Sequence, residues 1–147
     1  MSSFVEIGGS IQCHHWIFIK DLNNTMSKRI LLIEDDPFLS SLLKNRFIKE
    51  GFEVDLAQTG DAGIKALKES GHDLVLLDLI LPGKSGFEVM EEINSDPLAP
   101  RIPILIISNL GQDSDIEKGR ELGAVGYLVK ARTSIDSLIG KAKEFLA

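Results

Sequence analysis

Short apolar runs recur along the chain and are separated by segments in which apolar residues follow a helical spacing. Runs without polar alternation are typical of strands that are buried on both faces, as in a parallel sheet. One segment alternates instead, and it predicts a strand with Val54 and Leu56 directed inward. The predicted strands are residues 30–33, 53–57, 74–77, 104–107 and 126–129.

Each predicted strand is followed by a predicted helix. Asp36 can cap the first helix with Pro37 at its first position, where the missing N–H is harmless. Thr59 can cap the second, and Thr133 with Asp136 resembles a capping box for the last. The predicted helices run over about residues 37–50, 60–70, 86–93, 112–122 and from 133 or 134 to 145.

Five strands that alternate with five helices predict an α/β fold with a doubly wound sheet. Right-handed crossovers then place helices on both faces of the sheet. The helices would cover it with apolar stripes, and the stripe of the first helix consists of Phe38, Leu39, Leu42, Leu43 and Phe47. In such folds a ligand binds at the carboxyl ends of the strands, so the residues that follow each strand are the candidates for function.

Composition narrows the class of protein. The 147 residues suffice for one domain, and a net charge of −6 disfavours a direct nucleic-acid surface, which would be basic. No apolar stretch approaches the roughly 20 residues that cross a bilayer, and the N-terminus lacks a secretory signal. The one cysteine cannot form an internal disulfide, which fits a reducing compartment. These features predict a cytoplasmic globular protein without membrane insertion.

The first segment, residues 1–27, differs from the rest because it has no helical period. We interpret it as an N-terminal extension, disordered or upstream of a natural start at Met26, and residues 28–147 as the domain. A flexible arm or an extra edge strand is the alternative. The adjacent residues Cys13, His14 and His15 lack the spacing of a zinc site.

Polar residues that could carry chemistry follow four of the strands directly. Acidic side chains follow the first and third strands, a hydroxyl follows the fourth, and an ammonium follows the fifth. They are Glu34, Asp35, Asp36, Asp78, Ser108 and Lys130. Because the carboxyl ends of parallel strands converge at one edge, we expect one pocket that contains them, with Asp36 serving as a helix cap.

Clustered carboxylates at this edge need a cation. Two like charges about 5 Å apart repel by roughly 3 kcal/mol at an effective dielectric constant near 20. Hard oxygen ligands suit Mg²⁺, which keeps places for water and phosphate oxygens. Asp78 follows a wholly apolar strand, so its backbone should be rigid, and an aspartate can attack phosphorus to form an acyl phosphate. Mg²⁺ and Lys130 would offset the charge that develops during transfer, and Ser108 could donate a hydrogen bond.

With these positions in this order, the chain resembles the receiver domain of two-component response regulators. The resemblance covers residues 28–147 and includes the local strings at residues 30–37, 77–83 and 126–130. It implies a flavodoxin-like sheet with strand order 2-1-3-4-5. It also implies that a histidine kinase or a phosphotransfer protein donates the phosphoryl group.

The resemblance assigns roles to individual residues. Asp78 would be the phosphoacceptor, assisted by Lys130 and Ser108. Asp35 would bind Mg²⁺ directly and Glu34 through water, and the remaining ligands would be Asp78 and the backbone carbonyl of Ile80. Ser108 and Tyr127 would form a switch pair that reshapes the surface of the fourth helix, fifth strand and fifth helix.

Four positions bear on the lifetime of the phosphorylated state and on the direction of the Lys130 side chain. Asn109 lies where the family usually keeps a small residue, so its amide could crowd or bond the acyl phosphate. Ala131 replaces the usual proline after the lysine, which leaves the aim of Lys130 open. Ile80 and Leu110 are apolar, and from them we hypothesise a long-lived phosphorylated state.

The resulting hypothesis is a signalling switch and not a turnover enzyme, with only self-catalysed phosphotransfer and slow autodephosphorylation. The length predicts a single-domain regulator that acts on an unknown downstream protein as a monomer or as a weak phosphorylation-dependent dimer. A phosphatase or nuclease of related architecture would need an acid at Ile80. The alternative is a receiver-like interaction module that works without phosphorylation. His72 is expected on the surface.

Overall fold

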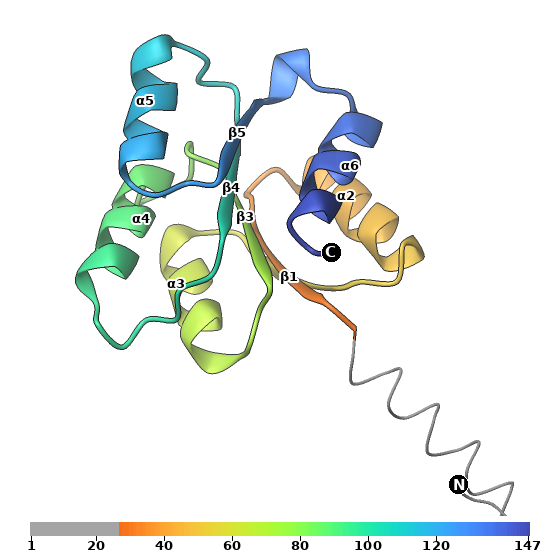
Figure 1. Ribbon diagram of the computed structural model, residues 1–147, viewed down its shortest axis with the longest axis horizontal. Coiled ribbons are helices and arrows are strands. Elements are labelled where there is room, and N and C mark those ends of the chain that lie inside the picture. Colours follow the sequence, from red (N-terminus) through yellow and green to blue (C-terminus); the bar gives the residue numbers. More distant parts are fainter. Residues whose placement is uncertain (1–26) are drawn as a thin grey trace, which may run out of the picture.

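The computed structural model describes residues 27–147 (Figure 1). The predictions made for residues 1–26, including the natural start at Met26 and the Cys13–His15 cluster, lie outside the described residues. In the described part, strands and helices alternate as the sequence predicted. No helix of residues 27–147 is long and apolar enough to cross a membrane.

The strands form one parallel sheet, and their order is β2-β1-β3-β4-β5, which confirms the predicted fold. Ile33 pairs with Leu77, so the carboxyl ends of β1 and β3 are level. The direction of winding changes between these two strands, which makes their ends the switch point of the sheet. The strands are β1 (Arg29–Ile33), β2 (Glu53–Ala57), β3 (Leu74–Leu77), β4 (Ile104–Ser108) and β5 (Gly126–Val129).

Helices cover both faces of the sheet. Figure 1 shows α3, α4 and α5 on one face and α2 and α6 on the other. A short 3₁₀ helix, η1 (Lys130–Arg132), follows β5 directly. The α-helices of the described region are α2 (Pro37–Lys49), α3 (Gly60–Glu69), α4 (Gly86–Ser95), α5 (Asp113–Glu121) and α6 (Ile135–Glu144).

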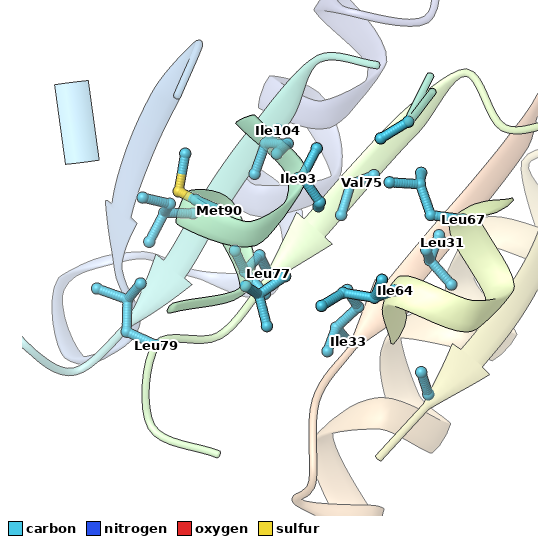
Figure 2. Packing of buried hydrophobic residues seen from close by; sticks show 14 residues of the cluster. Leu31, Ile33, Ile64, Leu67, Val75, Leu77, Leu79, Met90, Ile93 and Ile104 are labelled. Atoms are coloured by element: carbon cyan, nitrogen blue, oxygen red, sulfur yellow. The ribbon is translucent and has the colours of Figure 1, made fainter. Parts of the chain in front are cut away.

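The alternation of side chains along each strand divides the core into two clusters. In β1, Leu31 and Ile33 pack toward α3 and α4, whereas Ile30 and Leu32 pack toward α2 and α6. Figure 2 shows the first cluster, where Leu77 of β3 lies among the side chains from α3 and α4. Burial on both faces explains why the central strands are apolar at every position.

Helix caps follow the sequence at two predicted positions and depart from it at a third. The side chain of Asp36 accepts hydrogen bonds from the first turn of α2, and Thr59 accepts one from α3. The predicted capping box of the last helix is wrong, because Ser134 caps α6 and accepts from Ser137 N. The Thr133 hydroxyl donates to the Val129 carbonyl instead.

Three burial predictions are also wrong. Leu56 is 39% exposed because β2 is an edge strand. The stripe of α2 is narrower than predicted, since Phe38 is 81% and Leu42 38% exposed. His72 is buried, not on the surface, and its Nε2 lies 2.8 Å from a carboxylate oxygen of Asp55, which gives the ring a polar partner.

Candidate functional site

Two backbone hydrogen bonds fix the acidic residues at the switch point. The Asp78 N–H donates to the Ile33 carbonyl at 3.0 Å, and the Glu34 N–H donates to the Ala57 carbonyl at 2.9 Å. The sheet ladder therefore extends one residue beyond the ends of β1 and β3. Asp78 and Glu34 are held by backbone geometry and not only by side-chain contacts.

Three carboxylates converge here. Glu34, Asp35 and Asp78 each offer one oxygen, and these oxygens all lie within 4.8 Å of one another. Glu34 and Asp78 are buried, whereas Asp35 is exposed, so the cluster opens to solvent on one side. Hard oxygen donors with an open side fit a Mg²⁺ ion that keeps several waters and accepts a phosphate oxygen.

Lys130 follows β5 at the edge of the sheet, and its side chain extends to the three carboxylates. Its Nζ lies 2.7 Å from an oxygen of Glu34 and donates to an oxygen of Asp78 at 3.0 Å. Burial of Lys130 opposes its charge, but these hydrogen bonds outweigh burial and raise the pKa of the ammonium. Lys130 is therefore a fixed positive charge beside the oxygens of Asp78.

The pKa of Glu34 moves in the direction that burial dictates. Desolvation raises the pKa of its carboxyl, and the charge of Asp78 adds to that effect, while the hydrogen bond from Lys130 opposes it. The Asp36 N–H also donates to Glu34 at 3.1 Å. Burial is therefore the main reason why the ionised form of Glu34 is disfavoured, and a cation bound at the cluster would favour that form.

Asp78 sits in a backbone cradle that the sequence did not reveal. The Ile80 N–H donates to its Oδ1 at 3.3 Å, and the Gly86 N–H donates to the Leu79 carbonyl at 2.9 Å. A Cβ atom on Gly86 would collide with the carbonyl oxygen of Asp78. Gly86 therefore lets α4 start directly against the strand end, and only its position at a predicted helix start hinted at this.

The predicted switch pair lies on the other side of the site. Ser108 is fully buried, and its hydroxyl oxygen accepts the Leu110 N–H at 3.3 Å. Tyr127 is half-buried, and its hydroxyl donates to the Leu110 carbonyl. Burial, followed by the charges of Asp115 and Asp78, raises the pKa of the Tyr127 phenol to about 12. The two side chains thus meet through the backbone of the β4–α5 loop.

Asn109 and Ala131 contact each other directly. The Asn109 side-chain oxygen accepts the Ala131 N–H at 3.1 Å. A proline at position 131 would have no N–H to donate in this bond. Sequence reasoning singled out each position but did not pair them, because they are 22 residues apart.

The structure thus brings four predicted residues together, namely Glu34, Asp35, Asp78 and Lys130. Sequence comparison agrees with this geometry, since residues 30–142 match the family model of the response regulator receiver domain. The chain belongs to the response regulator receiver family. The roles of individual residues in this receiver stay predictions.

Curated relatives are longer than this receiver. The phosphate regulon transcriptional regulatory protein PhoB of Rhizobium meliloti (strain 1021) is 36% identical over 121 residues, which cover 82% of this chain and 53% of that protein. The transcriptional regulatory protein AfsQ1 of Streptomyces coelicolor is 38% identical over 101 residues, which cover 69% and 44%. The chain spans about half the length of the curated relatives it matches.

Solved receivers superpose along nearly their whole length. The activated receiver domain of Klebsiella pneumoniae RstA, solved with BeF₃, is 28% identical with a TM-score of 0.73 and covers 81% of this chain and 98% of that one. The CheY-like receiver of Methanospirillum hungatei JF-1 is 27% identical with a TM-score of 0.73 and covers 80% and 92%. The receiver fold therefore accounts for the whole described sheet.

Proposed function

We propose that this chain is a phosphoryl-accepting response regulator and that Asp78 takes the phosphoryl group. The observation that carries the proposal is the convergence of the buried Glu34 carboxylate, the exposed Asp35 carboxylate and the Lys130 ammonium on the buried carboxylate of Asp78. The Asp78 nucleophile and the incoming phosphoryl group are both negatively charged. The Lys130 ammonium beside Asp78 would offset part of that repulsion.

The transfer forms one bond and breaks another. A carboxylate oxygen of Asp78 attacks the phosphorus of a phosphohistidine, an O–P bond forms, and the P–N bond breaks with its electron pair on the leaving imidazole nitrogen. Lys130, which already donates to Asp78, stabilises the negative charge on the transferring oxygens. The Ser108 hydroxyl, now bonded to Leu110, would turn to donate to the phosphoryl group.

The donor set fits a magnesium ion. Asp35 and Asp78 would bind it directly and Glu34 through water, and the Ile80 carbonyl would complete the protein ligands. Bound there, Mg²⁺ would supply positive charge that draws the phosphoryl oxygens toward Asp78. The exposed carboxylate of Asp35 leaves that side open to the donor.

Exposed apolar side chains beside the site supply a surface for a kinase or phosphotransfer protein. Phe38 lies in the first turn of α2 and is 81% exposed, and Ile80 lies two residues after Asp78 and is 55% exposed. Both follow the carboxyl ends of neighbouring strands, so a donor that brings its histidine to Asp78 would contact them. A large exposed aromatic is the residue type that dominates binding energy at such interfaces.

Phosphorylation would change the surface formed by α5, β5 and α6. Tyr127 lines a groove of about 250 Å³ between α5 and β5, together with Ile116, Arg120 and Val125. Movement of Ser108 toward a phosphoryl group would release the Leu110 backbone that Tyr127 now bonds, so the groove would change shape. We propose that this face binds a downstream protein in the cytoplasm, and that residues 28–147 neither bind nucleic acid directly nor turn over a substrate.

Intact mass spectrometry tests the proposal. The protein is incubated with acetyl phosphate in the presence of Mg²⁺ or of EDTA. We expect a gain of one phosphoryl group with Mg²⁺ and none with EDTA. If the mass does not change with acetyl phosphate or with a histidine kinase, the chain is a phosphorylation-independent interaction module and the proposal is wrong.

A further inference from the structure

Two loops meet next to Lys130, although they lie far apart in the sequence. The β4–α5 loop follows Ser108, and the turn that leads into η1 follows β5. Their direct link is the hydrogen bond from the Ala131 N–H to the Asn109 side-chain oxygen, at 3.1 Å. This bond joins the residue after Ser108 to the residue after Lys130.

A second contact shows that the two loops pack and do not merely approach. A Cβ atom on Gly111 would lie 3.1 Å from a guanidinium nitrogen of Arg132 and 3.3 Å from a methyl carbon of Val129. The missing side chain at Gly111 therefore allows the loop to lie against the turn. Asn109 and Gly111 contact the turn on either side of Lys130.

The turn is also held from its own side. The Thr133 hydroxyl donates to the Val129 carbonyl at 2.9 Å, and the Thr133 N–H donates to the Lys130 carbonyl at 3.3 Å. These bonds set the curvature of η1. They do not fix the turn relative to Asp78, because Thr133 belongs to the same segment.

The strand that leads to Lys130 lies at the edge of the sheet. Within residues 27–147, β5 pairs with β4 on one side and has no strand on the other. A four-carbon stem joins the lysine ammonium to the backbone, so the place of the backbone sets the region that the ammonium can reach. The ammonium nevertheless lies within 3.0 Å of oxygens of both Glu34 and Asp78.

We propose that Asn109 is a positioning residue for Lys130 in phosphoryl transfer. Its side-chain carbonyl holds the Ala131 amide and thereby the backbone from which Lys130 reaches Asp78. The inference rests on the proposed transfer to Asp78 as the reaction that Lys130 assists. It also gives the β4–α5 loop a mechanical link to the lysine, in addition to its links to Ser108 and Tyr127.

The test is a double-mutant cycle on the rate of transfer from acetyl phosphate, followed by intact mass. Asn109→Leu keeps the branched shape of the side chain and removes the acceptor oxygen. Because the bond is exposed and water competes with it, we expect this variant to slow transfer by about two- to fivefold. In a Lys130→Ala background, followed over hours, Asn109→Leu should cause no further slowing, since there is no ammonium left to position.

Asn94→Leu is the matched control. The Asn94 side chain donates to the Leu122 carbonyl at 2.8 Å, so it also ties a side chain to a distant backbone group, but on α4 and away from Asp78. Its loss should leave the rate unchanged. Amide hydrogen exchange gives a direct readout of the bond, and the Ala131 N–H should exchange faster in Asn109→Leu than in the wild type.

The outcomes separate this inference from the proposed function. If the wild type gains no phosphoryl group, both fall. If the wild type is phosphorylated and Asn109→Leu slows transfer equally with and without Lys130, Asn109 acts on stability or access and the positioning role is wrong. An unchanged transfer rate, or unchanged exchange at Ala131, would overturn it as well.

Discussion

The two halves of the site are built differently. On the β1–β3 half, every residue of β3 is buried, and the backbone ladder continues through Asp78 and Glu34. On the β4–β5 half, β4 is buried, but every residue of β5 is only partly buried, and side-chain hydrogen bonds of Tyr127 and Asn109 to backbone hold the loops that follow the two strands. Backbone ladders in a packed core resist local opening, whereas exposed side-chain bonds exchange easily.

This difference indicates a division of labour. The rigid half holds the carboxylates in place, which favours a reaction that depends on precise placement. The other half holds Ser108 and Tyr127 through one loop residue, Leu110, so a single new bond at the site can rearrange it. Lys130 links the two halves, because it follows β5 in the sequence while its ammonium contacts Glu34 and Asp78 at the ends of β1 and β3.

The largest expected effect is at the centre of the rigid half. Asp78→Asn keeps the size of the side chain and removes the nucleophilic carboxylate, so phosphorylation by acetyl phosphate should be abolished in intact-mass measurements. Asp36→Asn is the control, because Asn also caps helices and Asp36 lies outside the cluster. Phosphorylation of Asp78→Asn at the wild-type rate would show that another residue accepts the group.

Removal of the residue that bridges the halves should come next. Lys130→Ala loses the charge that stabilises the transferring oxygens, and the rate of transfer should fall by a factor on the order of 100. Time courses of intact mass measure it. Lys141→Ala, on the exposed side of α6, should transfer at the wild-type rate.

The β4–β5 half of the site can be tested through the phenol of Tyr127. Tyr127 is the one tyrosine of the chain, so alkaline ultraviolet difference absorbance reports it alone. Burial raises its pKa from 10.0 to about 12 in the folded protein. The phenol therefore contributes stability that is present below pH 10 and is lost as the pH rises toward 12. Titration near 10 in the folded protein would contradict the buried position of Tyr127.

Substitution of the exposed Phe38 should distinguish docking of the phosphodonor from the chemical step. Phe38→Ala should slow transfer from a histidine kinase by about tenfold, as the loss of an aromatic anchor does at an interface, and leave transfer from acetyl phosphate unchanged. Leu98→Ala is the matched control, since Leu98 is 90% exposed but follows α4, far from Asp78 in the fold. An equal loss with both donors would place Phe38 in the chemistry instead.

The smallest effect concerns α6, the helix that follows the β4–β5 half of the site. Ser134→Ala removes the cap of α6 and should lower the free energy of unfolding by about 1 kcal/mol in urea titrations. Asp136→Asn alters the other half of the capping box that the sequence predicted, and it should cost less than about half as much because it loses only an exposed ion pair with Arg46. A larger loss of stability in Asp136→Asn than in Ser134→Ala would instead support the predicted capping box of Thr133 and Asp136.

The sequence predicted the fold because the central strands are apolar at every position, and it predicted the pocket because polar residues follow those strands directly. The sequence did not predict burial correctly where the burial of a side chain depends on its neighbours in the fold. Leu56 and Phe38 are apolar but lie at the margins of the sheet and of α2, and His72 is polar but is buried against Asp55.

Pairings between distant loops were also beyond the sequence. Asn109 and Ala131 each depart from the usual receiver pattern, and only the fold shows that one bonds the other. Thr133 and Ser134 are both good caps, so the choice between them depended on the Val129 carbonyl, which Thr133 bonds. Tertiary contacts decided these details, while local patterns decided the elements.

The most direct test of the account is to locate the phosphoryl group on the chain. The protein is phosphorylated with acetyl phosphate and Mg²⁺, reduced with borohydride, which converts an acyl phosphate of aspartate to homoserine, and digested for tandem mass spectrometry. We predict homoserine at position 78 alone. Homoserine at Asp35 or at another acid, or a phosphoryl group on a hydroxyl or histidine, would contradict the assignment of Asp78 as the phosphoacceptor.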